Sequence, residues 1–348
     1  MAIATNIIHT IQASKKTGLL VVLVDSGMKL PARLPAPIAH EVKAYLKELE
    51  FTGGWGAAEL FLAPEGTGQA FIGVIGLGKS DVDESSRAEA VRRGIGKLVQ
   101  EARRHMVHEV QVLLSDTETV SVATAVVEAA FLADYRFFAH KKHSEVEHKA
   151  RSLKSLVLVV PKETQAAVKA AVTETKKVME AIELVRNLVN QPASHMSPAT
   201  LVQEAKQIAK SSPLLALKVM DHKAAKAAGM TAFLAVAQGS QEEPYVIHLS
   251  YLPGRQAGKP KKPKRKIILV GKGVTFDSGG LSLKPANYME DMKIDMAGAA
   301  TVLAVLSVLP ALKLPIEVQA IVAACENMPS GNAYRPGWLT RWSKNQTW

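Results

Sequence analysis

One stretch decides how this chain folds: Val270–Ala300, with the sequence VGKGVTFDSGGLSLKPANYMEDMKIDMAGAA. It begins at the end of an apolar run, residues 267–270, whose branched side chains without polar alternation predict a buried strand. A glycine-punctuated loop with lysines and carboxylates follows, and small residues then begin a helix. Paired glycines allow close backbone approach, and open α/β sheets bind ligands beyond the carboxyl ends of their strands. The stretch therefore predicts an active-site loop.

The charged side chains on this loop indicate a metal site. Lys272 lies between two glycines, Asp277 and Lys284 follow, and an acidic cluster ends at Asp295. A single Lys or Asp in a loop is usually solvated, but several of them between a strand and a helix favour chemistry. Carboxylate oxygens suit divalent ions. A lysine nitrogen can join them only when it is deprotonated, which requires burial and a neighbouring cation.

The longest matching strings resemble the leucyl aminopeptidases, the two-metal cytosol aminopeptidase family. Residues 270–285 and 292–300 carry the resemblance, and the segments 188–198 and 324–337 are also similar to family segments. The resemblance therefore extends over at least residues 188–337.

This resemblance implies a set of roles for the loop residues. Lys272, Asp277 and Asp295 would be ligands of two divalent ions, Mn²⁺ or Zn²⁺, with Asp277 contacting both. Lys284 would be catalytic, because it would polarise the substrate carbonyl or stabilise the gem-diolate. The implied activity is two-metal hydrolysis that releases amino-terminal residues from peptides, with leucine preferred.

The chain departs from the family after Gly337. Family members continue with an Asn-Thr-Asp-Ala-Glu-Gly-Arg motif that supplies two more metal-binding carboxylates and an arginine that holds a bicarbonate. No Asp-Ala-Glu-Gly-Arg string occurs here, and three of the four tryptophans fall within residues 338–348. We interpret those residues as an anomalous tail, truncated or out of frame, and the catalytic domain as incomplete.

The departure predicts a chain with little or no activity, since three ligands are too few to hold two ions in place. Activity would instead require other ligands from Glu290, Asp291 and Glu326. His195 lies in a proline-flanked loop without metal-ligand spacing, so we leave it outside the site.

Composition bounds the class of protein. With 348 residues and 47% apolar side chains, the chain is long enough for two domains. A single cysteine, Cys325, cannot form an internal disulfide, which fits a reducing compartment. No apolar run approaches the roughly 20 residues that span a bilayer, and the start of the chain lacks the order of a signal peptide. We expect a cytoplasmic protein without membrane contact.

The net charge of +11 raises nucleic acid as a partner. Much of this charge falls in one run without acids, and Lys141–Lys142 and Lys176–Lys177 add to it. The run consists of Arg255, Lys259, Lys261, Lys262, Lys264, Arg265 and Lys266. A charge run is usually a solvated loop, and this one lacks the aromatic residues that stack on bases. DNA binding is therefore the alternative to catalysis: a non-catalytic fragment or a binding protein would need only a basic surface with salt-dependent affinity.

Alternating strands and helices predict an α/β fold. We expect strands at 19–24, 70–76, 110–114, 156–160, 215–220, 245–249, 267–270 and 316–324. We expect helices at 86–104, 120–135, 163–190, 197–211, 223–229 and 299–309. The pattern predicts an amino-terminal α/β domain with a mixed sheet, and the resemblance implies that an incomplete carboxyl-terminal α/β/α metallopeptidase domain follows it.

The predicted domain organisation has four parts. Residues 1–162 form a non-catalytic domain, 163–190 a connecting helix, 191–337 the partial catalytic domain and 338–348 the anomalous tail. The resemblance also implies a homo-oligomer, a hexamer in the family, although an incomplete catalytic domain weakens that expectation.

Overall fold

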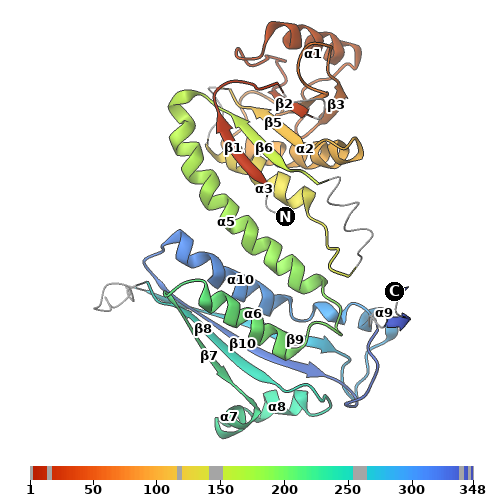
Figure 1. Cartoon of the computed structure of the whole chain (residues 1–348), viewed down its shortest axis with the longest axis vertical. Coiled ribbons are helices and arrows are strands. Elements are labelled where there is room, and N and C mark those ends of the chain that lie inside the picture. Colours follow the sequence, from red (N-terminus) through yellow and green to blue (C-terminus); the bar gives the residue numbers. More distant parts are fainter. Residues whose placement is uncertain are drawn as a thin grey trace. The chain divides into compact units, whose positions relative to one another are not determined.

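The computed structural model shows two compact units, Met1–Met179 and Glu180–Trp348 (Figure 1). Helix α5 (Gln165–Asn190) contributes residues to both units and matches the helix predicted there. The predicted domain boundaries themselves stay predictions. The structure describes residues 3–13, 18–115, 120–140, 152–253 and 265–336, together with the backbone of 341–343 and 346–347.

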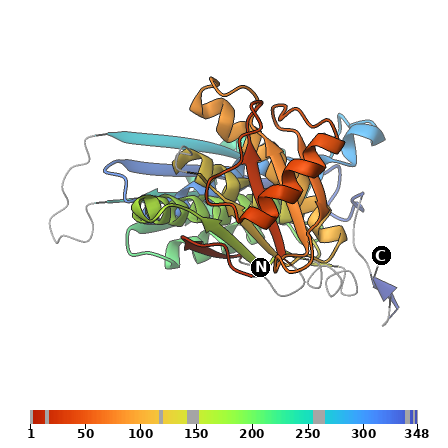
Figure 2. The same cartoon turned by 90° about the horizontal axis from the view of Figure 1, so that it is seen from above.

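The first unit contains a six-stranded sheet of order β1-β6-β5-β2-β4-β3, seen from above in Figure 2. All neighbouring strands run parallel except the antiparallel pair β3–β4, so the sheet is mixed, as predicted. The strands are β1 (Ala4–Ile8), β2 (Gly18–Val24), β3 (Ala58–Leu62), β4 (Phe71–Gly76), β5 (Glu109–Leu113) and β6 (Ser155–Val159).

Helices bury both faces of this sheet. Every residue of β2 is buried, and alternate side chains enter different hydrophobic clusters. Leu19 packs in the cluster of α2 (Glu84–Arg104) and α3 (Val120–Asp134), whereas Leu20 packs in the cluster of α1 (Ala36–Glu48). This three-layer packing explains why β2 reads as a continuous apolar run.

The second unit contains a four-stranded sheet of order β7-β8-β10-β9. Only β9 and β10 are parallel, and the other two pairs are antiparallel. The strands are β7 (Leu215–Met220), β8 (Tyr245–Tyr251), β9 (Lys266–Asp277) and β10 (Glu317–Asn327). The helices of this unit are α6 (Pro198–Lys210), α7 (His222–Ala227), α8 (Thr231–Ala237), α9 (Ala286–Met289) and α10 (Ala297–Leu312), with the 3-10 turn η3 (Met292–Ile294) before α10.

Helices α6 and α10 share one hydrophobic cluster with the sheet of the second unit. Ser197 caps α6 with Pro198 in its first turn, and it also forms a capping box with Thr200. Helix α8 was not predicted from the sequence, because its pattern merges with that of α7.

Strand β9 corrects one prediction, that residues 267–270 are buried. Ile267, Ile268 and Val270 are 43%, 53% and 76% exposed. The reason is position: β9 is the outermost strand of its sheet within the described residues, and α10 packs on one face of it. A Cβ at Gly271 would lie 2.7 Å from the carbonyl oxygen of Gly298 in α10, so Ile268 and Val270 point to the other face.

The exposed edge of β9 predicts self-association of this chain, because a long apolar edge strand is a template for pairing. Replacing Val270 with Lys should lower concentration-dependent light scattering while changing the free energy of unfolding by about 0.5 kcal/mol or less. Leu62→Lys is the matched control, since Leu62 is 75% exposed on β3 of the other sheet. An unchanged signal with Val270→Lys, or an equal effect of both substitutions, would contradict a role for β9.

Helix α10 bears on the expectation that no apolar run approaches membrane-spanning length, since α10 itself has 16 residues. With the charged turns before it, α10 forms the helical stretch Ala286–Leu312, which is long and apolar enough to cross a membrane by length and composition alone, with a mean hydropathy of 1.8 in its best window. Its side chains Leu303, Leu306 and Leu309 are buried in the hydrophobic core of the second unit. The apolar composition of α10 is therefore accounted for by its packing on the sheet.

Candidate metal centre

The predicted site residues gather at the carboxyl end of β9, and a β-bulge makes this possible. Along the parallel pair, Cys325 lies opposite Val274 but Asn327 lies opposite Asp277, so β9 holds one extra residue at Thr275–Phe276. Lys272 and Asp277 are five residues apart and would face opposite sides of a regular strand. The extra residue turns Asp277 to the face that carries Lys272.

Asp277 is held by three donors. Lys284 Nζ donates to Oδ2, while the Gly279 backbone N–H and Asn327 Nδ2 donate to Oδ1 at 3.0 and 2.7 Å. Burial raises the pKa of Asp277, but the hydrogen bonds from Lys284, Gly279 and Asn327 outweigh it and hold the pKa below its ordinary value. Asp277 is therefore an anion, as a metal ligand must be.

Lys272 and Asp295 form the second pair of the site. Their side-chain atoms Nζ and Oδ2 lie 2.8 Å apart, with Asp295 at the end of η3. The close contact of its ammonium with the Asp295 carboxylate raises the pKa of Lys272, with an opposing contribution from burial and smaller ones from the charges of Asp295 and Asp277. Lys272 is thus a cation in this structure, and it becomes a ligand only by losing its proton.

The loop between Asp277 and Lys284 is shaped by its glycines. Gly279 and Gly280 have backbone φ values of 89° and 66°, which residues with a Cβ rarely adopt. The backbone N–H of Lys284 donates to the carbonyl of Ser278 at 2.9 Å, which closes the loop and directs Lys284 back to Asp277. The paired glycines are therefore required for this fold of the loop.

The alternative ligands take different places. Glu326 is 1% exposed and accepts hydrogen bonds from Arg335 and from Ser240 Oγ, so its carboxylate is part of the core. Glu290 and Asp291 are exposed beside η3. Sequence reasoning missed Asn327, although its position at the end of the neighbouring strand β10 could have indicated it.

Comparisons with known proteins match most of the chain and not only this loop. The profile described as "Cytosol aminopeptidase family, catalytic domain" matches residues 183–347, and that of the family's N-terminal domain matches residues 20–144. A probable cytosol aminopeptidase of Bordetella pertussis is 33% identical over 359 residues, covering 100% of this chain and 69% of the relative. The chain belongs to the cytosol aminopeptidase family.

This membership confirms the resemblance found in the sequence, and two further relatives show its extent. A probable cytosol aminopeptidase of Aquifex aeolicus is 36% identical over 94% of this chain and 63% of its own length. The solved structure titled bottromycin maturation enzyme BotP in complex with Mn has a TM-score of 0.70 and 28% identity, covering 95% of this chain and 64% of that chain. The chain thus spans about two thirds of the length of the proteins that it matches.

The residues present fit a divalent ion in part. The carboxylates of Asp277 and Asp295 and the amine of Lys272 provide hard or borderline donors. Asp295 Oδ2 is buried and makes no hydrogen bond of good geometry within the described residues, although Lys272 Nζ is near. The described residues contain no group of three or more His, Cys, Asp or Glu side chains placed around one point. Two carboxylates and one amine are therefore the candidate donors that the described residues provide.

Cys325 lies beneath the site and is predicted to be unreactive. Burial raises its pKa to about 11, with a further contribution from the Asp277 charge. At pH 8 only about one thousandth of this thiol would be thiolate, and the thiolate is the nucleophile. We expect a thiol reagent such as Ellman's reagent to label the native chain about 100-fold more slowly than the urea-unfolded chain; equal rates would show that Cys325 is accessible.

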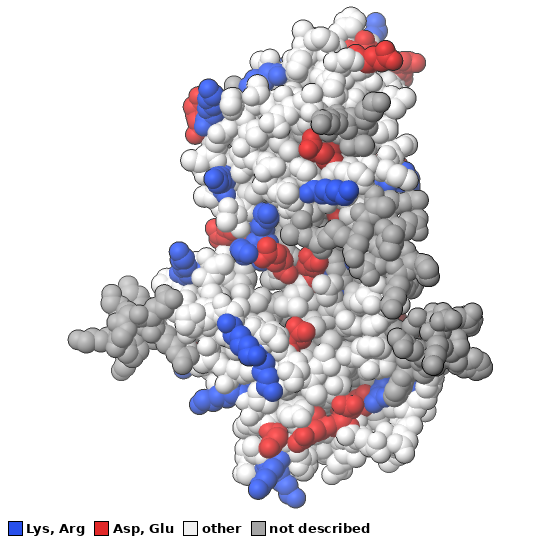
Figure 3. Space-filling view, viewed as in Figure 1, with Lys and Arg blue, Asp and Glu red and all other residues white. Residues whose placement is uncertain are grey.

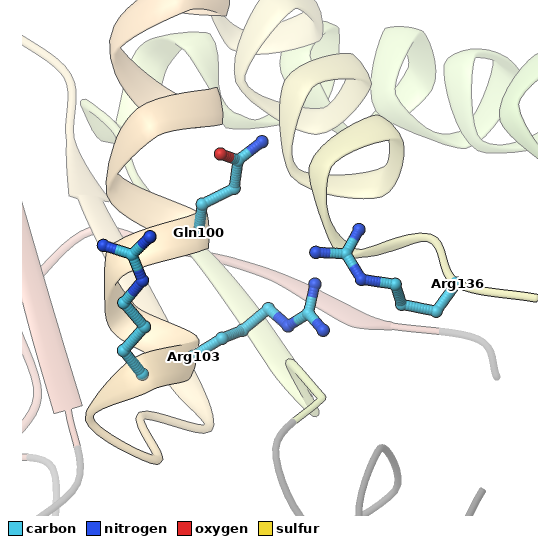
Figure 4. Close-up of a pocket in the computed structure, with 4 residues that line it drawn as sticks. Gln100, Arg103 and Arg136 are labelled. Atoms are coloured by element: carbon cyan, nitrogen blue, oxygen red, sulfur yellow. The ribbon is translucent and has the colours of Figure 1, made fainter. Parts of the chain in front are cut away.

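A basic cavity of about 170 Å³ lies in the first unit, and none of the predicted site residues lines it. It is lined by Gln100, Arg103, Arg104 and Arg136, and Figure 4 shows the guanidinium groups of Arg103 and Arg136 directed towards one another. Arg104 pairs with Glu101, and Arg103 lies 3.9 Å from the buried Asp134. Arg103 and Arg104 also end α2, where cations interact favourably with the helix dipole. Structural interactions thus account for both of these arginines.

Most of the predicted basic run cannot be placed. Residues 254–264 lie outside the described residues, as do Lys141–Lys142 and the side chains of the tail. Of the run, Lys266 pairs with Glu317 at 3.1 Å. Figure 3 shows Lys and Arg interspersed with Asp and Glu over the described part of one face. Nothing in that view favours nucleic acid as a ligand.

Proposed function

We propose that the site at the end of β9 belongs to a metal-dependent aminopeptidase that releases amino-terminal residues, leucine preferred, from peptides. The observation that carries this proposal is the convergence of Lys272, Asp277, Asp295 and Lys284 on one face of the sheet end. Family membership supports it, and so does the manganese named for BotP.

The residues would divide the chemistry between them. Lys272, Asp277 and Asp295 would hold the ions, Mn²⁺ or Zn²⁺, and Asp277 would contribute its anionic carboxylate. When bound, such ions would lower the pKa of water at the site and polarise the substrate carbonyl. Lys284 would leave Asp277 and place its ammonium where negative charge develops on the carbonyl oxygen of the cleaved bond. Its 27% exposed side chain leaves room for that movement.

Peptides are the proposed substrates, and a cytoplasmic location follows from the "cytosol" in the relatives' names. The family hexamer and DNA binding have no supporting observation in the described residues, so catalysis is the function we favour.

We predict that the 348-residue chain hydrolyses little substrate, because the described residues provide only these candidate donors for two ions. The test is Mn²⁺- and Zn²⁺-dependent hydrolysis of leucine p-nitroanilide by two proteins. One is the chain itself, and the other joins this chain up to Gly337 to the part of the Aquifex aeolicus relative that it does not match. We expect activity in the longer protein, loss of it on Asp277→Asn, and little activity in the shorter chain.

Two controls separate the outcomes. The intact relative, assayed alongside, establishes the conditions, and the metal content of each protein establishes loading. Activity in the 348-residue chain would overturn the prediction of impairment while supporting the function. A folded, metal-loaded longer protein that cleaves nothing would count against the aminopeptidase itself.

A further inference from the structure

We propose that Asn327 is a positioning residue, which fixes the orientation of the Asp277 carboxylate for metal binding. This inference rests on the proposed function of the site and adds to it a residue outside the predicted ligand set. The argument comes from the register of two strands, from the hydrogen bonds of one side chain and from the support beneath it.

The strand register brings Asn327 directly beside Asp277. Asn327 is the last residue of β10 and pairs with Asp277 across the parallel ladder, immediately after the bulge. Paired residues of neighbouring strands point to the same face of a sheet. The bulge therefore places Asp277 on the face of Lys272 and next to an amide side chain in the same step.

Asn327 holds the loop through both its side chain and its backbone. Its Nδ2 donates to Asp277 Oδ1 at 2.7 Å, and its carbonyl oxygen accepts from the N–H and the Oγ of Ser278 at 2.9 and 2.8 Å. An ionised carboxylate only accepts hydrogen bonds, so the amide must present its NH₂ group to Asp277. A Cβ at Gly280 would lie 3.0 Å from Asn327 Oδ1, which shows how closely the loop folds over this amide.

The amide is anchored from below. The preceding residue, Glu326, is 1% exposed and forms a bidentate pair with Arg335, with Nε–Oε1 and Nη2–Oε2 distances of 2.5 and 2.6 Å. Ser240 donates a further hydrogen bond to the same carboxylate. This pair fixes the end of β10, and Asn327 transmits the fixed position to Asp277.

The two oxygens of the Asp277 carboxylate therefore have different partners. Oδ1 accepts from the Gly279 backbone N–H and from the Asn327 side-chain amide, whereas Oδ2 meets only the ammonium of Lys284 within the described part of the chain. Oδ2 is thus the oxygen presented to a cation: Lys284 here, and a divalent ion in the proposed enzyme. Outer-shell partners of this kind set the orientation of a ligand, and losing one typically costs about 10- to 100-fold in metal affinity.

The test compares Mn²⁺ affinity, by isothermal titration, in the 348-residue chain and four variants. Asn327→Leu keeps the branching of the side chain at Cγ and removes the donor, with the smaller Asn327→Ala as a second version should the first not fold. Ser240→Ala is the matched control, because it removes a partly buried hydrogen bond to Glu326 while leaving the bidentate Arg335 pair that fixes the strand end, and it does not touch Asp277. Asp277→Asn tests the proposed site itself. Circular dichroism establishes folding, and the visible spectrum of bound Co²⁺ reports the geometry of the ligands.

We expect Asn327→Leu to weaken Mn²⁺ binding about 10- to 100-fold and to change the Co²⁺ spectrum, while Ser240→Ala does neither. Equal losses in Asn327→Leu and Ser240→Ala would reduce Asn327 to a structural role. Unchanged binding in Asn327→Leu, with a loss in Asp277→Asn, would overturn the positioning role and leave the proposed function standing. Unchanged binding in Asp277→Asn would overturn both.

Discussion

Replacing Asp277 with Asn is expected to weaken Mn²⁺ binding by more than about 100-fold, above the usual cost of losing an outer-shell partner. Asn has nearly the same volume and shape, so the substitution removes the charge and little else. Asp277 is the only carboxylate among the predicted ligands that accepts from a backbone N–H, an amide and an ammonium in the described residues. Its loss therefore removes the best-oriented anionic oxygen of the site.

The same argument predicts an opposite effect for Lys284. Its ammonium occupies Asp277 Oδ2 in this structure, so it competes with an incoming ion and repels it. We expect Lys284→Met to tighten Mn²⁺ binding while abolishing the proposed stabilisation of the reacting carbonyl. Isothermal titration calorimetry of Asp277→Asn and Lys284→Met measures whether each substitution weakens or tightens Mn²⁺ binding.

Asp291→Asn is the control for this pair, because Asp291 is an exposed carboxylate on the same loop. We expect it to leave Mn²⁺ affinity unchanged. Equal losses in Asp277→Asn and Asp291→Asn would mean that the alternative acidic cluster supplies ligands. If Lys284→Met did not tighten Mn²⁺ binding and Asp277→Asn did not weaken it, the ion would bind elsewhere.

The composition of the site could be read from the sequence, but its geometry could not. Lys272, Asp277, Lys284 and Asp295 stand out because lysines and carboxylates interrupt a glycine-rich loop after a strand. Strict alternation would have put Lys272 and Asp277 on opposite faces. The bulge that reunites them is visible only in the pairing of β9 with β10, which depends on residues about fifty positions away.

The sequence pattern also could not predict whether residues 267–270 are buried. Four aliphatic residues at 267–270 predict a strand correctly, because β-branched side chains favour extended backbone. They do not reveal where the strand lies in its sheet. β2, with a similar run, is central and wholly buried, whereas β9 is outermost and exposes Val270. Order in a sheet follows from tertiary pairing, not from local preference.

Replacing Arg335 with Met is expected to destabilise the second unit by about 3–5 kcal/mol, the usual cost of leaving a buried charge without its partner. Glu326 is 1% exposed and Arg335 8% exposed, and the two side chains form a bidentate pair. Without the guanidinium, the Glu326 carboxylate keeps the hydroxyl of Ser240 but no opposite charge among its neighbours in the described residues. The loss of stability should be largest at the end of β10.

A double substitution separates the charge from the packing. Glu326→Leu with Arg335→Met replaces both partners by apolar groups, and it should recover most of the loss because no charge stays buried. Lys266→Met is the control: its Lys266–Glu317 pair has a lysine side chain that is 53% exposed, so its loss should cost less than about 1 kcal/mol. Native-state hydrogen exchange of the β10 amides measures all three variants in the affected unit. If Arg335→Met and Lys266→Met lowered protection equally, the buried pair would contribute no more than an exposed one, and the anchor proposed beneath Asn327 would lose its energetic basis.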